Sequence, residues 1–233
     1  MRTCVVVPTY NERENVQGLV ERLRSVGVPD LRLLFVDDSS PDGTADVIRE
    51  ISAKEPWVGV LVRDSKKGIG SAYSEGFRHA RETLDPDVIV EMDADLQHPP
   101  AVLPELLKAV GEGADVAIAS RYVPGGGMEG WGRGRRIVSR GANAYARFAL
   151  RLALKDCTSG FRAYSRGAAA KVVEASLPAR GFEFQVATLH LLGNSSKMVE
   201  VPYIFTSRRA GRSKLGLVDM TRFFFSVLKM SFG

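Results

Sequence analysis

Asp93 and Asp95 directly follow residues 88–92, an apolar run typical of a short buried strand. Side chains at a strand end project into a loop instead of lying on a helix surface. Their oxygens, with the amide of Gln97 close behind, are hard ligands suited to Mg²⁺ or Mn²⁺ that bridges a diphosphate. The motif is weak on its own, because a solvated acidic turn has the same sequence.

Other polar loops follow apolar, β-branched segments in the first half of the chain. Residues 4–8, 31–36 and 58–62 have the composition of strands, and residues with helical spacing follow each of them. Alternating strands and helices form a mostly parallel sheet, whose strands end at one edge where ligands bind. The sequence therefore predicts an α/β fold with helices on both faces of the sheet and a ligand site at that edge.

Asp37 and Asp38 end the second of these strands. A carboxylate at this place can accept hydrogen bonds from a base or a ribose. Asp42 and Thr44 follow in a segment whose side chains suit Asx turns and helix caps. We predict that Asp38 is functional and that Asp42 or Thr44 is mainly structural.

The loop after the first strand has two interpretations. Asn11 and Glu12 either contact a ligand or cap the helix that follows. Tyr10 has the shape to stack on a base. The sequence alone does not decide between these roles.

The composition changes after an expected strand at 116–119. Residues 125–136 combine glycines with arginines, which predicts a mobile cationic loop. No internal repeat and no clear linker interrupts the chain. The remaining expected elements are a strand over 198–205, a basic loop over 207–214, and helices over 139–155 and 217–232.

The bulk composition limits the class of protein. The chain has 233 residues, 45% of them hydrophobic, which is enough for one substantial core. A formal charge of +5 favours an anionic partner: nucleotide, phospholipid or nucleic acid. Two cysteines are too few for a disulfide framework and lack zinc-site spacing, so free thiols in a reducing compartment are expected. We expect neither a secretory signal nor a membrane-spanning segment.

Taken together, the loops resemble those of inverting glycosyltransferase family two, which has the GT-A (Rossmann-like) fold. Two later motifs, residues 120–126 and 158–164, more narrowly resemble dolichol-phosphate and polyprenol-phosphate mannose synthases. The resemblance implies a catalytic domain over 1–215 and an amphipathic membrane-interface segment over 216–233. The four loops that carry the family resemblance, in order along the chain, are residues 7–12, 36–44, 67–73 and 92–99.

The resemblance also implies roles for individual residues. Asp93, Asp95 and Gln97 would hold Mg²⁺ or Mn²⁺. The catalytic set would be Asp95 with Arg121, Arg135 and Ser139, the last three holding the acceptor phosphate and sugar. Ser207 and Ala210 depart from the pattern, because such enzymes often carry an acidic and an aromatic residue there. The residues expected to bind the donor, GDP-mannose, are Pro8, Tyr10, Glu12, Val36, Asp38, Lys66, Asp93, Ala94, Gln97, Arg208 and Lys214.

A lipid phosphate fits the residues for a chemical reason. It is anionic at neutral pH, so its oxygen can attack without a general base, and the site needs cations instead. Arginines suit phosphate capture. Arg133, Arg135 and Arg136 either do this or form a solvated basic turn. His98 is either a base or, as we favour, a turn residue, and Glu183 either orients the sugar or caps a helix.

Two segments offer apolar surface beside cations for a lipid tail. The helices expected over 139–155 and 217–232 either lie in a membrane interface or pack on the core, and for the Phe-rich second one we favour the interface. We expect peripheral attachment to the cytoplasmic face of a membrane, with or without an anchoring partner.

Two other functions use similar features. A glucosyltransferase acting on UDP-glucose and the same lipids would need the same loops, which do not fix base or sugar. A non-catalytic protein that binds nucleotides or nucleic acid would use the positive charge. The cations, however, cluster with glycines near the expected diphosphate site, and no aromatic-basic RNA motif is present. We therefore expect no nucleic-acid partner and favour mannosyl transfer to a polyprenyl phosphate.

Overall fold

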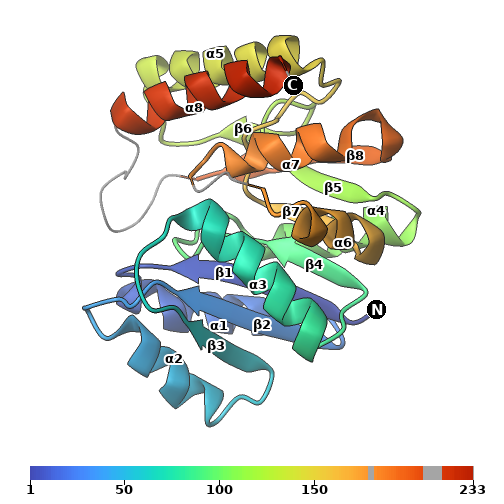
Figure 1. The fold of residues 1–233 in the computed structure, drawn as a ribbon. Helices are drawn as coiled ribbons and strands as arrows, with labels where there is room; N and C mark the ends of the chain where they lie inside the picture. Colours follow the sequence, from blue (N-terminus) through green and yellow to red (C-terminus); the bar gives the residue numbers. More distant parts are fainter. Residues whose placement is uncertain (178–180, 207–216, 233) are drawn as a thin grey trace.

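A computed structural model describes residues 1–177, 181–206 and 217–232. A seven-stranded sheet of order β3-β2-β1-β4-β7-β5-β8 forms its centre (Figure 1). One strand, β7 (Arg162–Ser165), runs antiparallel between β4 and β5, and the others are parallel, so the predicted α/β fold with a mostly parallel sheet is confirmed. The parallel strands are β1 (Thr3–Thr9), β2 (Leu31–Asp37), β3 (Val58–Val62), β4 (Val88–Glu91), β5 (Val116–Ser120) and β8 (Met198–Pro202).

Helices cover both faces of this sheet, as the hydrophobic strands require. On β1, Val5 and Val7 pack into one hydrophobic cluster, whereas Cys4 and Val6 face the other. A Cβ at Gly76 would lie 2.5 Å from Val6 Cγ1, so this glycine lets α3 approach the sheet closely. The first face carries α1 (Arg13–Val26), α2 (Thr44–Ser52), η1 (Pro100–Val102) and α4 (Leu103–Gly111); the second carries α3 (Ile69–Thr83), α6 (Arg166–Glu174), α7 (Phe184–Leu192) and η2 (Gly193–Ser195).

The two remaining helices, α5 (Arg133–Leu150) and α8 (Leu217–Ser231), pack side by side (Figure 1). The rings of Tyr145 and Phe224 stack at 4.7 Å, and the Tyr145 hydroxyl donates to the Phe224 carbonyl. Val227 is fully buried, so α8 belongs to the same core as the sheet. None of the helices in the described part of the chain has the length and apolar character needed to cross a bilayer.

The sequence-based expectations fail locally in the second half. The predicted loop over 125–136 is wrong: β6 (Gly127–Met128) pairs with β9 (Ile204–Phe205), and α5 already begins at Arg133. The helix expected over 139–155 therefore starts and ends earlier. β6 forms through a partner strand far along the chain, which local composition does not reveal. The basic loop expected over 207–214 lies outside the described residues.

Candidate active site

The carboxyl ends of β1, β2 and β4 meet at one edge of the sheet. The loop after each strand contains one non-glycine residue with a left-handed backbone: Asn11 (φ 57°), Ser39 (φ 54°) and Leu96 (φ 62°). For residues other than glycine this backbone conformation is strained, and such strained residues are concentrated at functional sites. The three loops turn sharply where the predicted donor-binding residues lie.

The two carboxylates after β4 are held by their neighbours. The Tyr73 hydroxyl donates to Asp93 Oδ1 at 3.1 Å, and Asp95 Oδ1 accepts from the Gln97 backbone nitrogen at 3.0 Å. The Asp93 side chain is 32% exposed, whereas Asp95 is 6% exposed. The Asp93 carboxylate is therefore accessible to a ligand, and the Asp95 carboxylate is fixed by its own loop.

These residues fit a hard divalent cation that shares its coordination with a substrate. Within the described residues no group of three or more His, Cys, Asp or Glu side chains is placed to enclose a metal. Asp93 and Asp95 would therefore supply only part of the coordination, and phosphate oxygens and water would supply the rest. Mg²⁺ binds in this way in many nucleotide sites, with one or two carboxylates.

His98 fixes the backbone of the same loop. The Asp93 backbone nitrogen donates to His98 Nδ1 at 3.0 Å, and the imidazole stacks on Phe161 at 5.3 Å. Burial lowers the pKa of His98 to about 4, so the ring is neutral at physiological pH. Because Nδ1 already accepts a hydrogen bond, the arrangement supports the role of His98 as a turn residue and gives no support to its role as a general base.

The first two loops bring the predicted nucleoside residues together. Pro8 and Val36 are direct partners in the β1–β2 ladder. The Lys66 ammonium lies 3.8 Å from the centre of the Tyr10 ring. Glu12 occupies the position before α1, but its side chain makes no capping bond and instead accepts from Asn15 Nδ2. The capping alternative for Glu12 is therefore not supported.

Asp42 has the structural role predicted for it. Its Oδ1 accepts from both the backbone nitrogen and the hydroxyl of Thr44, and Oδ2 accepts from the Arg13 backbone. These bonds fix the start of α2 and lower the pKa of Asp42.

Asp38 is bound by a buried arginine that sequence reasoning missed. Arg63 is 3% exposed and donates to Asp38 Oδ1 at 2.7 Å and to the Ser71 hydroxyl at 2.6 Å. Burial raises the pKa of Asp38, and the Arg63 cation opposes that rise. The signal was present in the sequence, because Arg63 directly follows the third strand, as Asp38 follows the second.

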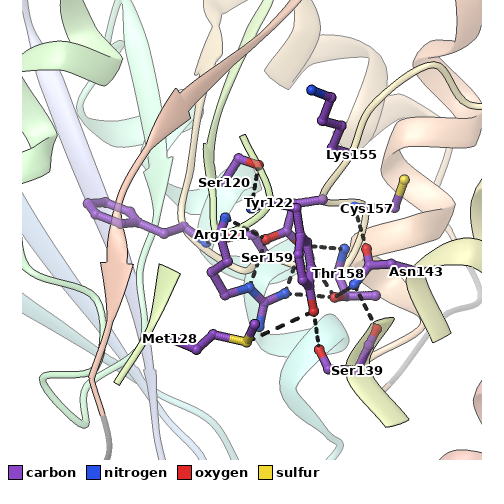
Figure 2. A network of polar contacts seen from close by, with 12 residues as sticks. Ser120, Arg121, Tyr122, Met128, Ser139, Asn143, Lys155, Cys157, Thr158 and Ser159 are labelled. Atoms are coloured by element: carbon purple, nitrogen blue, oxygen red, sulfur yellow. Dashed lines mark hydrogen bonds and ion pairs between the residues drawn. The ribbon is translucent and has the colours of Figure 1, made fainter. Parts of the chain in front are cut away.

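At the end of β5, the Arg121 guanidinium is held by the buried carboxylate of Asp156 (Figure 2). Its Nε and Nη2 each donate to Asp156 at 2.7 Å, and Nη2 also donates to the Thr158 hydroxyl. Asp156 raises the pKa of Arg121 although burial opposes the charge, and Arg121 in turn lowers the pKa of Asp156. Among the described residues Arg121 Nη1 has no hydrogen-bond partner.

Ser139 is joined to Arg121 through the same network, as Figure 2 shows. The Tyr122 hydroxyl donates to Ser139 Oγ at 2.8 Å, and Asn143 Nδ2 bridges the Ser139 carbonyl and the Thr158 hydroxyl. Two residues predicted to hold the acceptor, 18 positions apart in the chain, are therefore brought together.

Glu200 of β8 fixes the loop that carries Asp156. Its carboxylate accepts from the Ser120 hydroxyl at 2.6 Å and from the backbone nitrogens of Lys155 and Asp156 at 2.8 and 2.9 Å. The turn that follows β5 has no room for a side chain at Gly126, because a Cβ there would lie 2.4 Å from the Ser120 carbonyl oxygen. Neither Asp156 nor Glu200 was predicted, since nothing near them in sequence marks their partners.

An aromatic cluster joins the two sides of the edge. The His98 ring lies 6.0 Å from Phe205, and Phe205 lies 5.2 Å from Trp131. The Arg121 guanidinium lies 5.6 Å from Phe205, and the Arg135 guanidinium lies 4.0 Å from Trp131. The predicted metal loop and the predicted acceptor cations therefore flank one packed group of rings.

The remaining predicted residues are less informative. Ala94 is buried, and Gln97 Nε2 donates to the Thr206 carbonyl at 2.9 Å. Glu183 accepts from the Gly181 nitrogen and makes no capping bond to α7, so only its sugar-orienting role stays a prediction. Arg208 and Lys214 lie outside the described residues.

Solved structures share this fold. A glucosyl-3-phosphoglycerate synthase from Mycobacterium tuberculosis, in complex with Mn²⁺, UDP-glucose and phosphoglyceric acid, has a TM-score of 0.66 at 24% identity and covers 98% of this chain and 79% of that chain. A mannosyltransferase from Pyrobaculum calidifontis, in complex with GDP-Man and Mn²⁺, has a TM-score of 0.60 at 15% identity and covers 99% of this chain and 72% of that one. Identities this low show the fold alone.

Sequence relatives are more similar. Polyprenol monophosphomannose synthase of Mycolicibacterium smegmatis is 42% identical over 228 residues, 97% of this chain and 85% of the relative. Undecaprenyl-phosphate mannosyltransferase of Micrococcus luteus is 43% identical over 92% of this chain and 88% of the relative. Dolichol-phosphate mannosyltransferase of Pyrococcus furiosus is 43% identical over 92% of this chain but only 59% of the relative.

The family profile described as glycosyl transferase family 2 matches residues 4–173, which run from β1 into α6. That span includes the metal loop, the nucleoside loops and the Arg121–Asp156 network. The family membership and the GT-A fold expected from the sequence motifs are confirmed. The chain therefore belongs to glycosyl transferase family 2.

Proposed function

We propose that this enzyme transfers mannose from GDP-mannose to the phosphate of a polyprenyl phosphate, with inversion at the anomeric carbon. The observation that supports this proposal most directly is the placement of two groups of residues at one edge of the sheet. Asp93 and Asp95 lie there across an aromatic cluster from Arg121 and Arg135. A carboxylate pair suits a metal-bound diphosphate, and paired arginines suit an acceptor phosphate. The names of three relatives at 42–43% identity support mannose and the polyprenyl class of acceptor.

The donor nucleoside lies over the loops after β1 and β2. Tyr10 and Lys66 provide a ring and a cation in contact with each other, which suits a base and its phosphates. Asp38 accepts hydrogen bonds from the base or the ribose, and Arg63 holds its carboxylate in place. Pro8 and Val36 form the floor between the two loops.

Mg²⁺ or Mn²⁺ bound by Asp93 and Asp95, with Gln97 close by, supplies charge neutralisation for the leaving GDP. Mn²⁺ in the two neighbouring structures supports a divalent ion of this kind. Tyr73 keeps the Asp93 carboxylate pointed into the site through its hydroxyl. Arg208 and Lys214 are proposed to contact the diphosphate.

The acceptor needs no protein base, because a phosphate monoester carries its own negative oxygen at neutral pH. Arg121 offers Nη1, its other nitrogens being held by Asp156 and Thr158. Arg135 and Ser139 contribute from the first two turns of α5. These residues align the phosphate oxygen with the anomeric carbon and neutralise the charge that gathers between two phosphates.

The lipid tail and a membrane surface meet α5 and α8. Phe148 on α5 and Phe225 on α8 are 88% and 65% exposed, and Phe232, directly after α8, is 85% exposed. Arg147 on α5 and Arg151, directly after it, are exposed beside them. Apolar rings beside cations suit a phospholipid interface. We propose that residues 216–233 and α5 rest together in that interface, with or without an anchoring partner. The two unpaired cysteines favour the reducing, cytoplasmic face.

A transfer assay tests the proposal. Purified protein in detergent micelles is given a polyprenyl phosphate, Mn²⁺, and either GDP-mannose or UDP-glucose, and lipid-linked hexose is detected by mass spectrometry. We expect product with GDP-mannose only, none after chelation with EDTA, and none with the uncharged polyprenol. Product with UDP-glucose and none with GDP-mannose would replace the proposed donor.

A further inference from the structure

We propose that Trp131 is a positioning residue for the acceptor phosphate, because its ring holds the guanidinium of Arg135 and packs beside that of Arg121. The two guanidinium carbons lie 4.0 and 6.0 Å from the centre of this one indole. The inference rests on the proposed function, since it assigns Arg121 and Arg135 to the acceptor. It adds a residue that none of the sequence motifs pointed to.

The two arginines need different support. Arg121 is 7% exposed and already fixed by Asp156 and Thr158. Arg135 is exposed, in the first turn of α5, and a long exposed side chain samples many rotamers unless a neighbour holds it. An indole face at 4.0 Å is the strongest aromatic partner for a guanidinium. Trp131 therefore gives Arg135 an aromatic partner on the same ring that lies beside Arg121.

Trp131 is itself held in place. Its ring meets the edge of Phe205 at 5.2 Å with an interplanar angle of 78°. Phe205 belongs to β9, which pairs with β6 just before Trp131. The platform under Arg135 is thus built from the same short sheet that replaces the predicted loop.

The indole nitrogen argues for a functional reason to have tryptophan here. Trp131 Nε1 is buried and has no hydrogen-bond partner among the described residues. A buried, unsatisfied donor costs stability, and a phenylalanine or leucine would avoid that cost. Tryptophan at this position leaves one donor unsatisfied, and its indole is the best aromatic face for holding a cation, which is what a positioning role requires.

The first test separates affinity for the two substrates. Trp131→Leu removes the ring and should raise KM for polyprenyl phosphate about tenfold, while KM for GDP-mannose stays within about twofold. Trp131→Phe retains an aromatic face and should recover most of the acceptor affinity. The control is Trp57→Leu. Trp57 precedes β3, the outermost strand on the donor side of the sheet, and its indole nitrogen donates to Glu55. An unchanged acceptor KM in Trp131→Leu would overturn the inference.

The second test does not need turnover. The chain has two tryptophans, so Trp57→Phe leaves Trp131 as the sole indole fluorophore. Titration with farnesyl phosphate should change its emission with saturation, whereas farnesol should not, and adding Arg135→Gln should weaken the apparent affinity. No change with farnesyl phosphate, or the same change with farnesol, would contradict the inference. If wild-type protein binds farnesyl phosphate in this way but forms no mannosyl lipid, the proposed function fails and the positioning role stands.

Discussion

The two halves of the sheet build their side of the active edge by different means. In the half formed by β1 to β4, polar side chains bond within their own loop, as Asp95 does to Gln97 and Asp42 to Thr44, or to a neighbouring loop, as Asp38 does to Arg63. In the half formed by β7, β5 and β8, bonds join distant segments. Arg121 and Asp156 are 35 positions apart, and Ser120 and Glu200 are 80 apart. The donor side therefore combines local turns with bonds between neighbouring loops, whereas the acceptor side is joined by bonds between segments up to 80 positions apart.

The difference has an energetic consequence. Local turns can lose one hydrogen bond and keep their course, because the neighbouring bonds remain. The Arg121–Asp156 pair is buried, and removal of one partner leaves an uncompensated charge. Substitutions in the donor-side turns should thus affect chemistry more than folding, and substitutions in a buried ion pair such as Arg121–Asp156 should affect both.

The largest effect is expected at the metal loop. Asp95→Asn should lower kcat for mannosyl transfer by about a thousandfold, because charge neutralisation at the leaving diphosphate contributes several kcal/mol. The thermal unfolding midpoint should change little, since an amide oxygen still accepts from the Gln97 nitrogen. Turnover is measured at saturating substrates over a range of Mn²⁺ concentrations. A variant with wild-type turnover would remove the metal from the mechanism.

On the acceptor side, Asp156→Asn should reduce the free energy of unfolding by about 3 kcal/mol, measured by urea titration. The pKa of Asp156 is lowered, so its stabilisation is complete above the unfolded pKa of about 4 and disappears only as pH falls through the folded value. The loss in the variant should therefore be constant from neutral pH down to about pH 5.

Asp85 provides the matched control for that substitution. It pairs with Arg2 and Arg166, but at 61% side-chain exposure. Asp85→Asn should leave the urea midpoint unchanged, because solvent already screens the pair. Equal losses in the two variants would contradict the claim that burial makes the Arg121–Asp156 pair important for stability.

The donor side has one buried cation of its own, which sharpens the comparison. Arg63→Gln should weaken binding of GDP about tenfold, measured by calorimetry, because Asp38 loses the partner that orients it. Arg78→Gln, an exposed arginine on α3, is the control. Wild-type affinity in Arg63→Gln would show that Asp38 does not contact the nucleoside or does not need orienting.

A smaller effect is expected on the membrane face. Phe225→Ser combined with Phe232→Ser should reduce sedimentation with anionic phospholipid vesicles about tenfold. Leu84→Ser, at an exposed site following α3, should have no effect. Transfer to a short, detergent-dispersed acceptor should continue in the double variant. Unchanged vesicle binding would place the membrane contact elsewhere.

The last effect depends on pH and is expected at the seam between the halves, where Glu91 of β4 lies opposite Arg162 of β7 in the antiparallel ladder. Both are fully buried, and burial raises the pKa of Glu91 to about 7 although Arg162 opposes the rise. The neutral form therefore stabilises the fold below the unfolded pKa of about 4.3, and this stabilisation is lost as pH rises through 7. Glu91→Gln should flatten the decline in unfolding midpoint between pH 5 and pH 8. An equal decline in both proteins would refute the assignment.

The sequence revealed most of the donor side because its signals are local. An apolar run followed by acids predicted the loops at Asp38, Asp93 and Asp95, and the structure places each at a strand end. The acceptor side was only partly predictable. Arg121, Arg135 and Ser139 were expected through a family resemblance, but Asp156, Glu200 and Trp131 were not. Their partners are distant in sequence, and the glycine-rich composition over 125–136 hid both β6 and the start of α5.

A crystal structure with GDP and Mn²⁺ tests the central claim most directly. Anomalous scattering at the manganese edge should give one strong peak in contact with the carboxylates of Asp93 and Asp95, with the guanine base over Tyr10 and near Asp38. The rings between the metal and Arg121 should keep their positions. A manganese peak away from both carboxylates, or GDP bound at another edge of the sheet, would contradict the account.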